Sequence, residues 1–374
     1  MSWFFCPTQV CLSPHALRDN AAVLSGLGKR CLVVTGKTSA AASGVLDDLA
    51  AVLPSIGIAY EVFDAVEPNP SIHTCHEGGR QAKAFGAEFV IGAGGGSAMD
   101  AAKAVAAYAA NDMAPMAIFD VHPAPPLPIA AIPTTAATGS EVNAYAVLTI
   151  PELGVKRTWT APGAFPAAAF LDPRYMASLS YDLAVATALD AFCHCAESYF
   201  SPRSTDLTRP LAAKGADLIW RSLLAVEAEH LGHAAQADIQ AVRTDLLTGA
   251  ALGGICIAHT GTGYPHPLGY NLSLSHGIAH GAACAFFEGD YLRRQAAAAP
   301  DLFRAFMDAA NLTDALFDKL AAFAGLAPRL TAEDVARYAG LIAGAKNFAN
   351  SIAPAGDDAA SIAELYKATF SVGA

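Results

Sequence analysis

The first half of the chain alternates short apolar runs with stretches in which apolar residues recur at helical spacing. Residues 38–53 and 71–85 have the spacing of amphipathic helices. The apolar runs around them have the length of strands and lie at 30–36, 58–66, 87–92 and 127–132, with two further candidates at 144–150 and 167–171. Strand and helix in alternation predict a parallel sheet covered on both faces, and such sheets bind ligands beyond the carboxyl ends of their strands.

The pattern changes after Asp172-Pro173. From about residue 181 the chain consists of long apolar-periodic segments rich in Ala and Leu, and these predict helices at 207–229, 238–258, 300–325 and 333–350. We therefore expect an α/β domain over residues 1–178 and an all-helical domain over residues 179–374.

Composition narrows the class of protein. With 53% hydrophobic and 15% charged residues among 374, the chain can bury two cores. The net charge of -11, with no basic run longer than Arg293-Arg294, argues against nucleic acid or an anionic membrane as a partner. Residues 1–7 lack the basic start of a signal peptide, and we expect a cytoplasmic protein without a membrane span. The eight cysteines include no CxxC pair and are expected to be reduced, buried and structural.

Two loops that follow predicted strands offer groups for a ligand. Residues 94–97, Gly-Gly-Gly-Ser, precede a strong helix former, so the free backbone N–H groups of a helix N-terminus are available to a phosphate. Residues 133–141 bring three threonines and one serine to the carboxyl end of another strand. Each pattern is also typical of an ordinary turn or helix cap, but the position of both after strands favours a shared ligand.

One carboxylate and several histidines mark a second candidate site. Asp190 and His194 are four residues apart in a predicted helix, so they share a face and can reach one cation, with a simple salt bridge as the alternative. Two of the downstream histidines would complete a site of three nitrogens and one oxygen suited to Fe²⁺ or Zn²⁺. Spacing alone leaves open which two, among His259, His266, His276 and His280. Cys193 and Cys195 flank His194 but are rotated roughly 100° from it on a helix, and we set them aside.

These segments resemble the iron-containing alcohol dehydrogenase family, in the same order and over almost the whole chain. Residues 94–103 are similar to the family signature GGGSxxDxAK, residues 133–141 to PTTxxTGSE, and residues 188–198 to the metal helix xDAxxHxxEx. Residues 66–70, 266–270 and the pair His280-Gly281 resemble three further family segments.

The resemblance implies a dehydroquinate synthase-like fold: an N-terminal dinucleotide-binding α/β domain, an all-helical C-terminal domain, and a metal in the cleft between them. The implied metal ligands are Asp190, His194, His266 and His280, because some family members place the last two histidines 14 residues apart. A spacing of ten, to His276, belongs to a branch that would need a histidine at Thr262, which leaves His276 as a pocket residue. The implied cofactor contacts are Asn69, Gly95, Gly96, Ser97, Asp100, Thr134, Thr135, Thr138 and Lys156.

The implied cofactor is NADH or NADPH. Gly36 stands where NAD-preferring members often carry Asp, and Lys37 follows it. Because a carboxylate there would repel a 2′-phosphate, its absence leads to the hypothesis that NADPH is accepted or preferred. The alternative is that Lys37 is a solvated turn residue.

The implied reaction is reversible hydride transfer between the nicotinamide and a small alcohol or aldehyde, with Fe²⁺ or Zn²⁺ as the Lewis acid. His276 and Tyr270, or else His259, are candidates for relaying the proton through water. A homodimer is expected from the habit of the family. The alternatives are a lyase of the dehydroquinate-synthase type, a glycerol-dehydrogenase-like polyol oxidase with Zn²⁺, and a non-catalytic NAD-binding protein. The sparse basic residues near the histidines argue against the lyase, and the intact ligand quartet argues against the non-catalytic protein.

Overall fold

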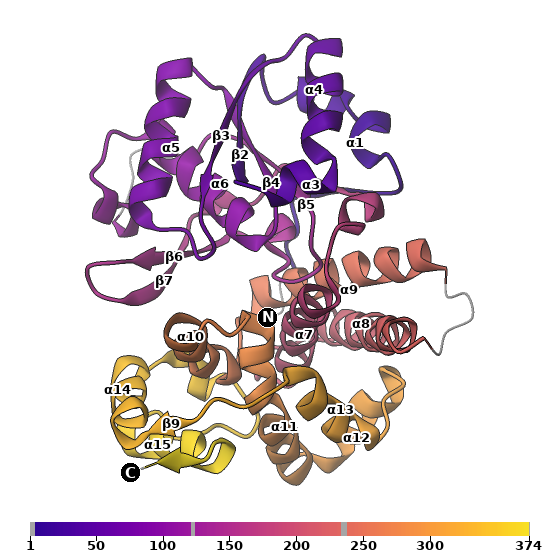
Figure 1. Ribbon diagram of the computed structural model, residues 1–374, viewed down its shortest axis with the longest axis vertical. Coiled ribbons are helices and arrows are strands. Elements are labelled where there is room, and N and C mark those ends of the chain that lie inside the picture. Colours follow the sequence, from indigo (N-terminus) through magenta and orange to yellow (C-terminus); the bar gives the residue numbers. More distant parts are fainter. Residues whose placement is uncertain (1–3, 121–123, 233–237, 374) are drawn as a thin grey trace. The chain divides into compact units, whose positions relative to one another are not determined.

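The computed structural model describes residues 4–120, 124–232 and 238–373. The chain forms two compact units (Figure 1). The α/β unit comprises Phe5–Leu179 and Asp238–Leu247, and the helical unit comprises Met1–Phe4, Ser180–Ala237 and Thr248–Ala374. The division at Leu179 follows the change of pattern in the sequence, whereas the grouping of Asp238–Leu247 with the α/β unit departs from a simple split in chain order.

The α/β unit is built on a six-stranded, all-parallel sheet in the order β1-β8-β5-β4-β2-β3. Its strands are β1 Gln9–Leu12, β2 Arg30–Gly36, β3 Ala59–Val66, β4 Phe89–Gly94, β5 Ile129–Pro133 and β8 Ala168–Leu171. The chain adds β3 on one side of β2 and β4 on the other, so the strand order reverses between β2 and β4. Ligands of open parallel sheets bind at such a switch point, beyond the carboxyl ends of the strands.

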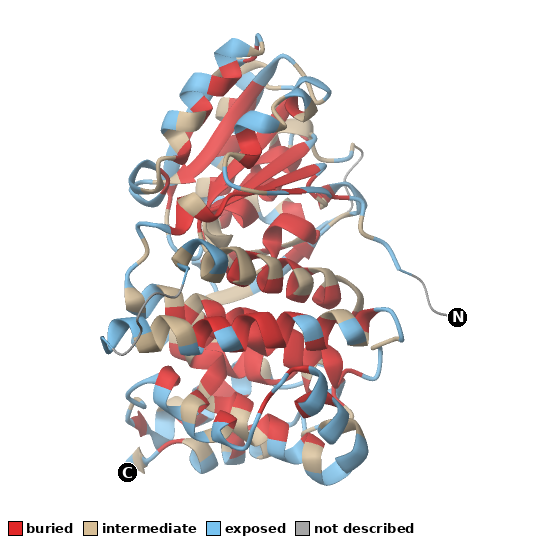
Figure 2. Cartoon of the chain, turned by 90° about the vertical axis from the view of Figure 1, so that its right-hand side faces the viewer, coloured by how far each residue is buried: buried red, intermediate tan, exposed pale blue. Residues whose placement is uncertain are grey.

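Helices cover both faces of the sheet. On one face Leu32 and Val34 share a core with α5 (Ile72–Phe85) and α6 (Gly96–Ala110). On the other face Cys31 and Val33 share a core with α1 (Ala16–Asp19), α2 (Ala22–Ser25), α3 (Ser39–Ser43) and α4 (Val45–Ser55). Successive residues of β2 therefore point to opposite cores. Because both cores are buried (Figure 2), the central strands consist mostly of apolar residues.

Two predictions within this unit need correction. The expected strand at 144–150 exists as β6 (Tyr145–Ile150) but lies outside the main sheet, because it pairs antiparallel with β7 (Val155–Thr160). The expected helix at 38–53 is divided into α3 and α4 by Gly44, whose φ of 82° is a left-handed conformation that ends a helix.

The helical unit has helices where the sequence predicted them, but two of the predicted helices are divided or shorter than expected. The expected helix at 300–325 is two helices, and the one expected at 333–350 ends at Ile342. Thr331 and Asp334 form a capping box at the start of α14. The helices are α7 Tyr181–Tyr199, α8 Thr208–His230, α9 Ile239–Thr260, α10 Pro265–His276, α11 His280–Ala298, α12 Pro300–Ala309, α13 Ala315–Ala324, α14 Ala332–Ile342 and α15 Ala359–Thr369, with the short strands β9 Leu330–Thr331 and β10 Val372–Gly373.

Among the described helices, α9 alone has the length and hydropathy of a membrane span. Half of its most apolar window is buried inside the protein. A core helix passes the same test of length and composition, so this helix is weak evidence for a membrane span.

Candidate metal centre and nucleotide loops

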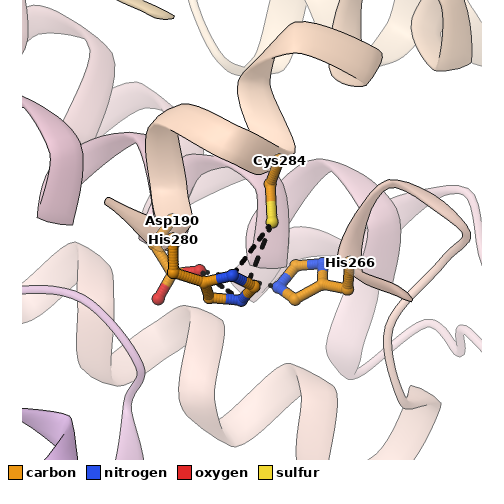
Figure 3. A group of neighbouring side chains, drawn as sticks. All are labelled: Asp190, His266, His280 and Cys284. Atoms are coloured by element: carbon orange, nitrogen blue, oxygen red, sulfur yellow. Dashed lines mark hydrogen bonds and ion pairs between the residues drawn. The ribbon is translucent and has the colours of Figure 1, made fainter. Parts of the chain in front are cut away.

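Three helices bring one carboxylate and three imidazoles together. Asp190 and His194 lie one turn apart on α7, His266 is the second residue of α10, and His280 is the first residue of α11. The Oδ1 atom of Asp190 is 3.9 Å from the Nε2 atom of His194, 3.6 Å from that of His266 and 3.7 Å from that of His280. Figure 3 shows Asp190, His266 and His280 converging on one point. The four residues that the resemblance implies as ligands therefore share one site.

The donor set fits a divalent cation. Within the described part of the chain, the buried Asp190 Oδ1 and His266 Nε2 atoms have no hydrogen-bond partner, and such atoms are rare in folded proteins unless a ligand satisfies them. Oxygen and nitrogen donors about 2.1 Å from one tetrahedral ion stand roughly 3.4 Å apart. The observed separations are only slightly wider, so a small contraction would close the site around an ion.

Electrostatics keep the carboxylate in its ligand form. Burial alone would raise the pKa of Asp190, but the imidazoles of His194, His266 and His280 outweigh burial and hold this pKa below its ordinary value. The buried carboxylate is therefore ionised at neutral pH, and an ionised carboxylate is the form that binds a metal.

Glu197 orients one of the imidazoles. It lies two turns after Asp190 on α7 and is fully buried. The Nδ1 atom of His266 is 2.8 and 2.9 Å from its two carboxylate oxygens, and the backbone N–H of Gly263 donates to Oε2. Burial lowers the pKa of His266, but Glu197 and Asp190 raise it to about 10. The carboxylate holds one proton on Nδ1, so Nε2 is the nitrogen that would release its proton to bind a metal. Glu197 lies within the metal-helix motif, but the motif does not predict its contact with His266, which lies 69 positions further along the chain.

A glycine allows the helices to approach closely. A Cβ atom at Gly281 would lie 1.9 Å from the carbonyl oxygen of Ala186 and 2.5 Å from the backbone nitrogen of Asp190. Any larger residue would therefore force α11 away from α7 at the turn that carries the carboxylate. The glycine that follows His280 in the sequence has a packing function at the metal site.

The three candidate proton relays differ in position. The Tyr270 ring stacks on His280, with centroids 5.0 Å apart. His276 ends α10, about 15 Å along the helix axis from His266, and its Nε2 atom is hydrogen-bonded with the Tyr338 hydroxyl. The Nδ1 atom of His259 donates to the carbonyl of Ile255. Of the three, Tyr270 is the one in contact with a candidate ligand, so the structure gives no support to a relay through His276.

The glycine loop at 94–97 and the threonine loop at 133–141 lie side by side, beyond the carboxyl ends of the neighbouring strands β4 and β5. A Cβ atom on Gly95 would be 3.4 Å from the Thr135 hydroxyl, and one on Gly96 would be 2.5 Å from the Thr138 side chain. Thr134 donates its N–H to the carbonyl of Gly94. The two glycines therefore let the threonine loop reach the first turn of α6, where the backbone N–H groups have no partner within the helix and are suited to an anion.

The remaining predicted contacts surround this turn. Ser97 accepts the N–H of Asn69, whose own φ is 59°. The Thr149 hydroxyl donates to the carbonyl of Asn69, and Thr149 pairs with Lys156 across the β6–β7 hairpin. Gly36 is the last residue of β2, next to β4 in the sheet, and the exposed Lys37 follows it.

Asp100 has partners inside the protein. Its Oδ1 atom accepts the Ser140 hydroxyl at 2.6 Å, and its Oδ2 atom accepts the N–H of Val147 at 2.9 Å. The buried Lys103 donates to Ser140 and to the carbonyl of Tyr145. Asp100 and Lys103 therefore tie α6 to the loop after β5, which is a bracing role and does not require a cofactor.

Comparison with known proteins agrees with this geometry. The family model for iron-containing alcohol dehydrogenase matches residues 7–173. The model for the C-terminal part of the Fe-containing alcohol dehydrogenase family matches residues 184–344. A 1-propanol dehydrogenase of Salmonella typhimurium (strain LT2) is 33% identical over 65% of this chain and 61% of its own length. The chain thus matches less than two thirds of that relative.

Solved structures match over nearly the full length. An iron-containing alcohol dehydrogenase of Thermotoga maritima is 34% identical, with a TM-score of 0.87 over 99% of both chains. A sulfoacetaldehyde reductase of Bifidobacterium kashiwanohense, solved in complex with NAD⁺, is 25% identical, with a TM-score of 0.80 over 99% of both chains.

Proposed function

The chain belongs to the iron-containing alcohol dehydrogenase family, and we propose that it catalyses reversible hydride transfer between a nicotinamide dinucleotide and a small alcohol or aldehyde. The observation that carries the proposal is the convergence of Asp190 with the imidazoles of His194, His266 and His280. A non-catalytic nucleotide-binding protein would have no use for buried, unsatisfied donor atoms of this kind.

The residues of the helical unit hold and shape the metal centre. Asp190, His194, His266 and His280 would bind a divalent cation such as Fe²⁺ or Zn²⁺, which supplies a Lewis acid that polarises the substrate oxygen. Glu197 keeps the proton of His266 on Nδ1, so that Nε2 faces the site. Tyr270 packs on His280 and is the candidate for passing the substrate proton to water.

The loops of the α/β unit would bind the dinucleotide. The first turn of α6 and the threonine loop offer backbone N–H groups and hydroxyls at the switch point of the sheet, which suits a pyrophosphate. We propose that NADPH is accepted as well as NADH, since Gly36 and Lys37 place no carboxylate at the end of β2. Turnover measured with each coenzyme tests this, and strict use of NADH would contradict it.

The substrate is proposed to be a short, primary alcohol or its aldehyde. The compared relatives bear the names of a 1-propanol dehydrogenase and a sulfoacetaldehyde reductase, so a panel of short neutral and acidic aldehydes is the appropriate screen. A homodimer and a cytoplasmic location stay predictions.

The decisive experiment removes a ligand. We expect Asp190→Ala and His266→Ala to lose bound metal and nearly all activity while circular dichroism shows an intact fold. His73→Ala, at an exposed histidine of the α/β unit, controls for loss of an imidazole elsewhere. A metal-free His266→Ala protein with full activity would refute the proposed site.

A further inference from the structure

A buried asparagine near the C-terminus connects the end of α7 to the loop between α9 and α10. Asn350 follows the short 3-10 helix η5 (Lys346–Ala349) and is buried. The hydroxyl of Ser201, two residues after the end of α7, donates to its Oδ1 atom at 2.7 Å. Its Nδ2 atom donates to the carbonyl oxygens of Thr260 and Thr262 at 2.9 and 3.0 Å. The side chain of Asn350 therefore joins two of the segments that lead to candidate metal ligands.

A second asparagine donates to the same loop. The Nδ2 atom of Asn347 is 3.1 Å from the carbonyl oxygen of Thr262 and 2.9 Å from its hydroxyl. The carbonyl of Thr262 thus accepts hydrogen bonds from two side-chain amides. Gly261, with a φ of 71°, lies in the left-handed region that favours glycine. This conformation lets the carbonyls on either side of Gly261 reach the same nitrogen atom of Asn350.

The peptide group between Thr262 and Gly263 connects these amides to the metal centre. Its C=O and N–H point in opposite directions, because the peptide bond is trans. The C=O accepts from the two asparagines, and the N–H donates to the Oε2 atom of Glu197, which in turn holds the Nδ1 proton of His266. Hydrogen bonds in such a chain polarise one another in a buried environment, so the bonds to the carbonyl orient the N–H and strengthen it as a donor.

We propose that Asn350, assisted by Asn347, is a positioning residue of the metal centre. It acts along a hydrogen-bond chain that runs through the Thr262–Gly263 peptide and Glu197 to His266. The inference rests on the metal centre of the proposed function. The competing explanation is that the two amides only stabilise the fold, in which case their loss would lower stability without a specific effect on the metal ligand.

The first experiment measures the Zn²⁺ affinity of the full-length protein by competition with a chelator. We expect Asn350→Ala to raise the dissociation constant about three- to tenfold, at and just below the lower end of the range for groups that hold a ligand directly. Asn347→Ala should raise it less, because the Thr262 carbonyl keeps one amide donor.

Asn111→Ala is the matched control for the loss of a buried amide. Asn111 belongs to the α/β unit, is buried to a similar extent, and also donates from Nδ2 to two backbone carbonyls. We expect this variant to lose stability, measured by denaturant unfolding, and to bind Zn²⁺ as the wild type does. A similar loss of Zn²⁺ affinity in Asn111→Ala and Asn350→Ala would contradict a specific positioning role.

A double-mutant cycle with Glu197→Gln tests the route. The Glu197→Gln side chain can accept only one of the two hydrogen bonds, from Gly263 or from His266, because one carboxylate oxygen becomes an amide donor. The hydrogen-bond chain is then broken, and Asn350→Ala should weaken Zn²⁺ binding by less than about twofold in this background. Independent effects on stability would instead add. Equal fold-changes in the two backgrounds would overturn the proposed route.

A spectroscopic signal reports on the last bond of the chain. In the Zn²⁺-loaded protein with isotope-labelled histidine, the Nδ1 proton of His266 should resonate far downfield, because it is shared with a carboxylate. Its shift in Glu197→Gln identifies the signal. We expect the signal to move upfield in Asn350→Ala and to keep its position in Asn111→Ala. A signal that does not move in Asn350→Ala would contradict the proposal.

The outcomes separate this inference from the proposed function. A wild type that binds Zn²⁺ tightly, with the affinity unchanged in Asn350→Ala and Asn347→Ala, overturns the positioning role and leaves the metal centre standing. A folded wild type that binds no Zn²⁺ overturns both. Should Asn350→Ala fail to fold, Asn347→Ala at a half-buried position decides by the same cycle and the same signal, and additive effects with Glu197→Gln then overturn the proposal.

Discussion

At the scale of single residues, two buried carboxyl groups near the candidate metal ligands differ in their hydrogen bonds. Glu197 accepts hydrogen bonds from His266 and Gly263. The oxygens of Glu288 have no hydrogen-bond partner among the described residues, and burial together with the charge of Glu197 raises the pKa of Glu288 well above its usual range. Glu197 is therefore the carboxyl group that is hydrogen-bonded to a candidate metal ligand.

Because Glu197 is hydrogen-bonded to His266, we expect Glu197→Gln and Glu288→Gln to have unequal effects on metal affinity. Glu197→Gln removes the charge that fixes the His266 tautomer, and we expect metal affinity to fall about 10- to 100-fold, as for other groups that support a ligand. Glu288→Gln changes a carboxyl group that makes no hydrogen bond to a candidate ligand among the described residues, and it should change the affinity little. Titration calorimetry with Zn²⁺ measures both. Equal affinities for Glu197→Gln and the wild type would show that His266 needs no charged partner.

The candidate metal ligands were easier to predict from the sequence than the residues that contact them. Helical spacing placed Asp190 and His194 on one face, because positions i and i+4 are neighbours, but that spacing also fits a simple salt bridge. His266 and His280 required the family resemblance, since no local pattern says which of several histidines meets α7. The role of Glu197 was missed for the same reason, because it depends on a contact with His266 that spans 69 positions of the chain.

At the scale of elements, the metal centre depends on how closely α11 approaches α7. The pattern of the sequence predicted the core strands and long helices, because burial on both faces imposes continuous apolar runs. It could not predict that the strand at 144–150 joins a separate hairpin, since partner choice is not local. It also could not show that Gly281 is a contact point between helices, because a glycine after a histidine resembles any loop residue.

The close contact at Gly281 predicts that one added methyl group at this position lowers both the stability of the fold and the affinity for metal. In Gly281→Ala the new Cβ atom would overlap the Ala186 carbonyl, so the helices must separate and carry Asp190 away from His280. We expect a loss of about 1–3 kcal/mol in unfolding free energy from overpacking and weaker Zn²⁺ binding. Gly289→Ala on the same helix is the matched control, because its nearest neighbour is the flexible Arg293 side chain at 3.5 Å. Tight Zn²⁺ binding by Gly281→Ala would contradict the packing role.

At the scale of the whole molecule, stability depends on charges buried in the α/β unit. Burial lowers the pKa of Lys103 to about 8, although Asp100 and Glu141 oppose the shift. Burial also raises the pKa of Glu141 to about 7, although Lys103 opposes that shift. Both groups belong to the brace between α6 and the loop after β5, and their proton uptake is therefore linked to unfolding.

The linkage of Glu141 gives a signed pH dependence. Its pKa rises from 4.5 to about 7 on folding, so between these values the folded protein binds more protons than the unfolded chain. The stability contributed by this group is complete below about pH 4.5 and is lost as the pH rises through about 7, by roughly 3 kcal/mol at 1.36 kcal/mol per pKa unit. Glu141→Gln, which cannot titrate, should not show this loss.

Denaturant midpoints of the wild type and Glu141→Gln across this pH range measure the effect. The variant should gain stability relative to the wild type as the pH rises from 4.5 to 7, because only the wild type acquires a buried charge. Glu77→Gln, on the exposed side of α5, controls for the loss of one carboxyl group. A constant difference between wild type and Glu141→Gln would mean that Glu141 is ionised in the folded protein throughout, and Lys103 would then be its compensating partner.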